Sequence, residues 1–62
     1  MTKSEYQNLT RGSLIAAKNK PEVYMCDAAS CDGGWWLLPL RDMRATAYMM
    51  ECLYKSWRVV RM

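Results

Sequence analysis

The sequence predicts an α+β fold with a short N-terminal helix, a small three-stranded antiparallel sheet and a long C-terminal helix. Three observations predict it: a helix-capping pattern near the start, three short apolar runs separated by turn-forming residues, and a stretch after Pro39 that contains neither Gly nor Pro. With 62 residues, we expect one small domain that spans 1–62.

The N-terminal helix is predicted from a capping box. Ser4 has the hydroxyl of an N-cap residue, and Gln7 stands three positions later, where its side chain can reach back to the N-cap backbone. Gly12 then occupies a position typical of the glycine that follows a helix end. These signals predict a short helix over about 5–11.

Three apolar runs predict the strands. Residues 13–17 form a short apolar run that ends at a Lys-Asn-Lys-Pro turn, and residues 22–26 alternate, with Val23 and Met25 on one face. A loop rich in Asp, Ser and Gly fills 27–34. The run 35–38 predicts a buried strand, in which adjacent tryptophans point to opposite faces.

The C-terminal helix is predicted over 41–60. Pro39 suits a first helical position, and Asp42 complements the positive end of the helix dipole. At about 100° per residue, most of the circumference of this helix is apolar, and the polar side chains gather on one arc. The polar arc consists of Arg41, Arg44, Tyr48, Glu51, Lys55 and Arg58. An alternative is a mainly α helical hairpin of helices 4–19 and 39–60, which requires an unusually long connection.

The apolar content predicts a binding partner. A chain of this length buries little of its surface, yet 52% of its residues are hydrophobic. We therefore expect a small non-enzymatic regulatory protein that binds a protein partner through its long helix, as a homodimer. The predicted interface consists of apolar side chains from that helix and from the tryptophan pair: Met43, Met50, Leu53, Tyr54, Trp57, Trp35 and Trp36.

The basic residues of the same helix predict an alternative function. The net charge is +3, and its whole excess lies after residue 40. Cationic side chains along one arc, with an aromatic ring between them, are typical of nucleic-acid contact. The residues of this predicted site are Arg41, Arg44, Tyr48, Lys55 and Arg58.

Catalytic and metal sites are not predicted. The chain has no His, so the usual general base is missing, and we expect no catalytic residue and no cofactor. Four residues separate Cys26 from Cys31 and Cys52 is distant, so we expect free thiols rather than a zinc site, although a site shared between two chains is an open alternative.

The compartment is predicted from the cysteines and from the N-terminus. An odd number of cysteines does not suit a disulfide-stapled secreted domain, and the first residues show neither a signal sequence nor a membrane span. We therefore expect a cytoplasmic protein. In its size, its Met and Trp content and its lack of catalytic motifs, the chain resembles the small accessory proteins with which bacteriophages modify a host protein.

Overall fold

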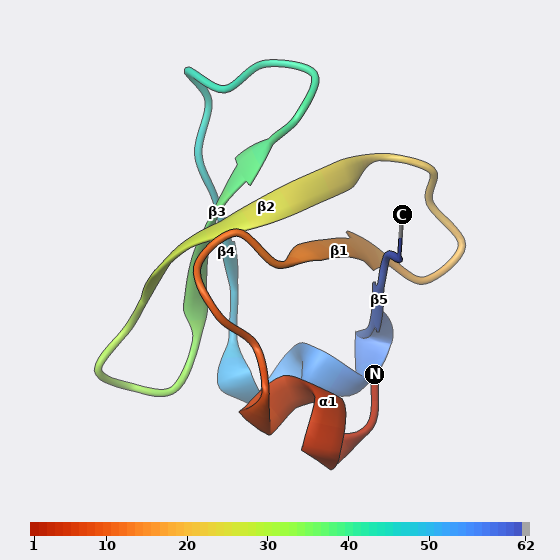
Figure 1. The fold of residues 1–62 in the computed structure, drawn as a ribbon, viewed down its shortest axis with the longest axis vertical. Coiled ribbons are helices and arrows are strands. Elements are labelled where there is room, and N and C mark those ends of the chain that lie inside the picture. Colours follow the sequence, from red (N-terminus) through yellow and green to blue (C-terminus); the bar gives the residue numbers. More distant parts are fainter. Residues whose placement is uncertain (62) are drawn as a thin grey trace.

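Alternation between inward and outward side chains runs through five short segments, and each of them is a β-strand. A computed structural model describes residues 1–61 (Figure 1). The strands are β1 (Leu14–Ala17), β2 (Val23–Ala29), β3 (Trp35–Pro39), β4 (Ala47–Met49) and β5 (Trp57–Val59). Two short helices complete the fold, the α-helix α1 (Lys3–Gln7) and the 3₁₀ helix η1 (Glu51–Ser56).

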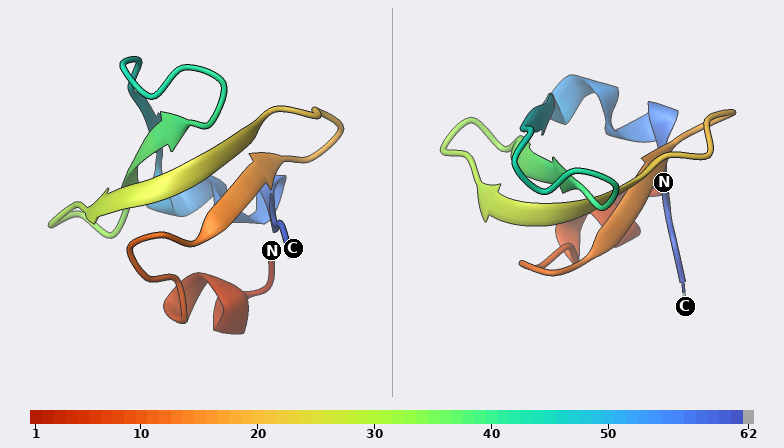
Figure 2. Two further views of the ribbon diagram at one scale, coloured as in Figure 1. Left: turned by 45° about the horizontal axis from the view of Figure 1, so that its top comes forward. Right: turned by 90° about the horizontal axis from the view of Figure 1, so that it is seen from above.

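The strands form one curled antiparallel sheet in the order β4-β3-β2-β1-β5 (Figures 1 and 2). The longest strand, β2, lies in the middle of this order, and its register with β3 shifts between Cys26 and Ala28. Such a bulge bends a strand and increases its twist. The curl lets a sheet of short strands enclose a core on its concave side.

The core lies on that concave side. Its fully buried side chains come from four different strands: Ile15, Cys26, Leu37 and Met49. Tyr6 and Leu9 from the α1 region and Tyr54 from η1 pack against this cluster. Figure 1 shows α1 and η1 next to each other across the open side of the curled sheet. The two helices therefore cover the inner face of the sheet.

The short N-terminal helix is present, but it begins earlier than the sequence pattern predicts. Thr2 is the N-cap, its side chain accepts a hydrogen bond from the backbone of Glu5, and the Glu5 carboxylate accepts one from the Thr2 backbone. This capping box replaces the predicted one of Ser4 and Gln7, because Thr and Glu offer the same pair of acceptors two residues upstream. Gly12, at a φ of 97°, belongs to the turn into β1.

The predicted α+β fold class is wrong, because the long C-terminal helix does not exist. Residues 47–49 and 57–59 are strands, and between them lies only the short 3₁₀ helix. Ala47–Met49 pairs with β3, and Trp57–Val59 pairs with β1, so distant strands supply the backbone partners that a helix would find locally. Pro39 closes β3 opposite Tyr24 instead of opening a helix.

The alternative, a mainly α helical hairpin, is wrong for the same reason. Residues 14–17 of its first helix and 57–59 of its second pair with each other as antiparallel strands. An apolar arc that covers most of a helical circumference does not select one buried face. The segment 47–59 therefore had little amphipathic reason to be a helix, and sheet pairing decided its structure.

Candidate functional site

The outer, convex face of the sheet carries mainly apolar side chains. Because neighbouring residues on a strand point to opposite faces, the neighbours of the core residues point outward. The strand registers align them in rows across the sheet: Leu14, Met25 and Leu38 form one row, Ala28, Trp36 and Tyr48 another, and Val23 and Leu40 a third, beside the fully buried Ala16. Antiparallel sheets of small domains usually show polar side chains on this face.

Trp36 is the most exposed of the large apolar side chains in these rows, at 49%. Its ring packs on that of Tyr48 with the centroids 4.6 Å apart. Its sequence neighbour Trp35 faces the core and is only partly exposed. The prediction that the two tryptophans point to opposite faces is thus confirmed, and Trp36 is the one available to a partner.

Asp32 fixes the aromatic pair from the β2–β3 hairpin. The Tyr48 hydroxyl donates a hydrogen bond to Asp32 Oδ1, and the Gly34 amide donates to the same atom at 3.0 Å. These two hydrogen bonds lower the pKa of the Asp32 carboxyl below its ordinary value, and the first of them raises the pKa of the Tyr48 phenol. The aromatic end of the outer face therefore carries a fixed negative charge.

The opposite end of β2 carries positive charge. Arg58 points outward from β5, and its guanidinium donates to the Lys20 carbonyl at 3.3 Å, while the Lys18 amide donates to the Ser56 carbonyl at 2.8 Å. Arg41 pairs with Glu22 at 3.0 Å, one residue beyond the Val23–Leu40 backbone hydrogen bond. We call this group, Lys18, Lys20, Arg41 and Arg58, the cationic end.

An open groove adjoins the cationic end. It has a volume of about 450 Å³ and is lined by Pro21, Glu22, Val23, Leu40 and Arg41. Leu40 is 44% exposed, and the ion pair between Glu22 and Arg41 borders the groove. The groove therefore offers aliphatic surface beside charged groups.

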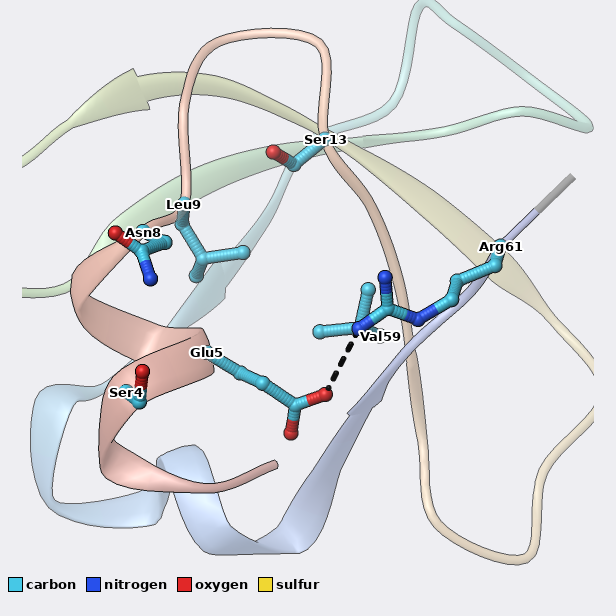
Figure 3. Close-up of a pocket in the computed structure, with 7 residues that line it drawn as sticks. All are labelled: Ser4, Glu5, Asn8, Leu9, Ser13, Val59 and Arg61. Atoms are coloured by element: carbon cyan, nitrogen blue, oxygen red, sulfur yellow. Dashed lines mark hydrogen bonds and ion pairs between the residues drawn. The ribbon is translucent and has the colours of Figure 1, made fainter.

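A second pocket lies on the other side of the molecule, between α1 and β5 (Figure 3). It has a volume of about 370 Å³ and is mainly polar, and its lining comes from both ends of the chain: Ser4, Glu5, Asn8, Leu9, Ser13, Val59 and Arg61. Figure 3 shows Glu5 and Arg61 extended toward each other, with 3.4 Å between Oε2 and Nη2. Because this pair neutralises itself, the pocket presents no free charge to a ligand.

The predicted interface residues are distributed over the molecule. Trp36 lies on the outer face, whereas Trp35 and Trp57 pack against the core. Met50 and Leu53, 52% and 49% exposed, lie at η1 on the opposite side from the outer face. The two remaining members lie apart from each other: Tyr54 is stacked on Tyr6 at 4.8 Å, and Met43 is exposed in the β3–β4 loop.

The predicted nucleic-acid residues are divided as well. Arg41 and Arg58 belong to the cationic end, where Lys18 and Lys20 join them. Tyr48 lies at the aromatic end beside Asp32. The other two are separate, since Arg44 pairs with Asp42 in the β3–β4 loop at 3.7 Å and Lys55 is exposed on η1.

Several outer-face residues were missed by sequence reasoning. Leu14, Leu38 and Leu40 were assigned no surface role, although the alternation of Val23 and Met25 in the sequence marked one face of β2 as apolar. The same period applied to residues 35–40 would have placed Trp36, Leu38 and Leu40 together. Lys18 and Lys20 gave no such signal, because their closeness to Arg58 depends on the pairing of β1 with β5.

The three cysteines lie in different surroundings. Cys26 is fully buried, and burial raises the pKa of its thiol to about 11, whereas Cys31 and Cys52 are exposed. Within residues 1–61, no three side chains of the metal-binding types His, Cys, Asp and Glu come together. The same residues include no helix of the length and hydropathy needed to cross a membrane.

Comparison with known proteins adds no relative: no protein-family model, no curated protein and no solved structure matches the chain.

Proposed function

We propose that this protein is a non-enzymatic interaction protein that binds a protein partner through the outer face of its sheet, and that the first such partner is a second copy of itself. The observation that supports the proposal is the set of apolar rows on the outer face, which α1 and η1 leave uncovered because they pack on the inner face. Uncovered apolar surface on a small protein is typical of an interaction site.

The charges favour a particular arrangement of the two copies. A two-fold axis near Trp36 packs like apolar surface against like, as an isologous interface requires. It also places the two cationic ends at opposite ends of the dimer, where they do not repel each other, and it brings only the two Asp32 carboxylates toward each other. A dimer centred on the cationic ends would instead bring eight cations together.

The size of the face sets the expected affinity. Five strands about 4.8 Å apart, with β2 seven residues long at about 3.3 Å per residue, give a face on the order of 500 Å². Two such faces bury at most about 1,000 Å², the low end for a specific interface. We therefore expect a weak dimer that forms in the micromolar range.

Sedimentation equilibrium over a concentration series tests the dimer. Trp36→Glu places a charge in the centre of the proposed interface and should make the protein monomeric at concentrations where the wild type is dimeric. Leu53→Glu is the matched control, because Leu53 has the same 49% exposure but lies on η1. A wild type that stays monomeric, or a dimer that Leu53→Glu dissociates and Trp36→Glu does not, would refute this interface.

Nucleic-acid binding is the second candidate function, and the cationic end favours it. Arg41 and Arg58 lie at the same end of the sheet as the turn that carries Lys18 and Lys20, and cations along one edge suit phosphate binding. The aromatic pair does not extend this surface, because the Asp32 carboxylate beside Tyr48 repels phosphate. For this reason we place protein binding first.

The cytoplasm is the compartment that we propose for this protein. Cys26, Cys31 and Cys52 are all free thiols, and a reducing compartment keeps thiols in that state.

A further inference from the structure

The net charge of the protein is concentrated at one end of the sheet. The four cations of the cationic end are accompanied by one carboxylate, that of Glu22, which leaves a local charge of +3. The chain as a whole also carries +3, so its other five cations are balanced by its other five carboxylates. The charge of the cationic end therefore equals the net charge of the whole chain.

Most of these cations have no ionic partner among residues 1–61. In the part of the chain that the structure describes, ion pairs hold Arg41, Arg44 and Arg61, but none holds Lys18, Lys20 or Arg58. Arg58 is oriented by its hydrogen bond to the Lys20 carbonyl, which keeps its guanidinium at the β1–β2 turn. The Arg58 guanidinium is thus held at the turn that carries Lys18 and Lys20.

The groove beside them is aliphatic. Pro21, Val23 and Leu40 supply apolar surface, and the lining contains no aromatic ring. The Arg41 side chain is 83% exposed, so its pairing with Glu22 is an exposed ion pair that another carboxylate can replace at little cost. The site therefore combines a place for an aliphatic side chain with four places for carboxylates.

We propose that the cationic end and its groove bind an acidic segment of a partner protein, in which an aliphatic side chain is flanked by Asp or Glu residues. The aliphatic side chain lies on Val23 and Leu40, and the flanking carboxylates bind the surrounding cations. This inference deepens the proposed function by giving the chemical class of a partner. It does not require the dimer, since the single chain already presents the cationic end and its groove.

The groove distinguishes a peptide from a nucleic acid. Proteins that bind single-stranded nucleic acid stack bases on aromatic rings, and none lines this groove. The exposed ring of Trp36 lies at the other end of β2, beside the charge of Asp32. An aliphatic groove adds nothing to phosphate binding, but it adds affinity for a Leu or Ile side chain.

Fluorescence anisotropy with three labelled probes tests the proposal. The first probe is a peptide that alternates acidic residues with Leu, and the second has Ser in place of each Leu. The third is a single-stranded oligothymidylate with the same number of negative charges. We expect the Leu peptide to bind most tightly and the affinity of all three probes to fall with added salt.

Single substitutions test whether the peptides bind at the cationic end and its groove. Lys20→Glu and Lys18→Glu should each weaken the Leu peptide about tenfold, because each replaces an attraction with a repulsion. Leu40→Ser should weaken the Leu peptide about fivefold and leave the Ser peptide unchanged. Lys55→Glu is the matched control, since Lys55 is an exposed lysine on η1, and it should change the affinity less than about twofold. Circular dichroism confirms that each variant is folded.

Three results would overturn the proposal. Equal affinity for the Leu and Ser peptides would show that the groove does not contribute to binding. Tighter binding of the oligothymidylate would show that the site prefers nucleic acid. Equal effects of Lys20→Glu and Lys55→Glu would show that the binding is non-specific. Sedimentation of the Trp36→Glu variant reports on the dimer alone. Failure of the peptide site and failure of the dimer interface are therefore separate outcomes.

Discussion

The Tyr48 hydroxyl donates a hydrogen bond to the Asp32 carboxylate and so joins the edge strand β4 to the β2–β3 hairpin. The two residues are sixteen positions apart, and the Gly34 amide completes the arrangement from within the hairpin. The same contact orients the Tyr48 ring on which Trp36 packs. The exposed aromatic surface of the proposed dimer interface therefore depends on one charged hydrogen bond.

Acid should weaken this contact. The hydrogen bonds from Tyr48 and Gly34 lower the pKa of Asp32 in the folded protein below 3.8, its ordinary value. A lowered pKa contributes stability above the pKa of the unfolded chain, and this stability is lost as the pH falls through the folded-state pKa. We expect urea midpoints of the wild type to fall below about pH 4, and those of Asp32→Asn to fall less steeply.

Tyr48→Phe is the companion variant for this test. It removes the hydroxyl donor while keeping the ring on Trp36, so it should reduce the acid dependence in the same way. If the wild type, Asp32→Asn and Tyr48→Phe lost stability in parallel between neutral pH and acid, the contact would have no energetic role.

Leu37 should contribute far more to stability than Leu40. Leu37 is fully buried and Leu40 is 44% exposed, although both belong to the same apolar stretch of sequence. Leu37→Ala should cost about 2–5 kcal/mol, most of the stability expected of a core of this size. Leu40→Ala should cost only about 0.5 kcal/mol. Denaturant unfolding measures both, and similar costs would contradict the assignment of inner and outer faces.

Gly34 should not tolerate a side chain. A Cβ atom at this position would overlap the Tyr48 ring and would lie 2.6 Å from the Met49 carbonyl oxygen. Gly34→Ala must therefore move β4 away from the hairpin, at a cost of about 1–3 kcal/mol. Gly12→Ala is the comparison variant, because a Cβ atom at Gly12 meets open space and its cost comes only from the backbone φ of 97°. A stable Gly34→Ala variant with unchanged tryptophan fluorescence would contradict this packing.

The cysteines should differ in reactivity. Burial raises the pKa of Cys26 to about 11, so its thiolate is scarce at neutral pH and a reagent cannot reach it. Cys31 and Cys52 are exposed and should react with a thiol reagent in the folded protein. We expect mass spectrometry to show two modified thiols under native conditions and three in denaturant. Modification of Cys26 in the native protein would contradict its place in the core.

The local elements of the first forty residues were largely predictable. The strands of residues 13–17, 22–26 and 35–38 are present, because alternation and turn-forming residues between them are local signals. Their extent was not predictable, since β2 continues to Ala29 and the predicted loop over 27–34 is wrong for its first three residues. Pairing with Trp35 and Trp36 across the β2–β3 hairpin extends it.

The candidate sites were predictable only in part. Trp36 was identified as an interface residue from its strand context, and the pairing with Tyr48 adds its surroundings. Arg41 and Arg58 were identified as anion-binding residues, but as parts of a helix that does not exist. Lys18 and Lys20 join them only because β5 returns to pair with β1.

The sequence by itself determined the short capped helix, the first three strands, the apolar excess and the positive balance of charge, because each of these depends on near neighbours or on composition. Only the tertiary structure decided the secondary structure of residues 41–60 and the positions of the outer face and the cationic end. A segment that is apolar on nearly every side fits a helix and a strand equally well, so the backbone hydrogen bonds that β3 and β1 offer to β4 and β5 made the choice.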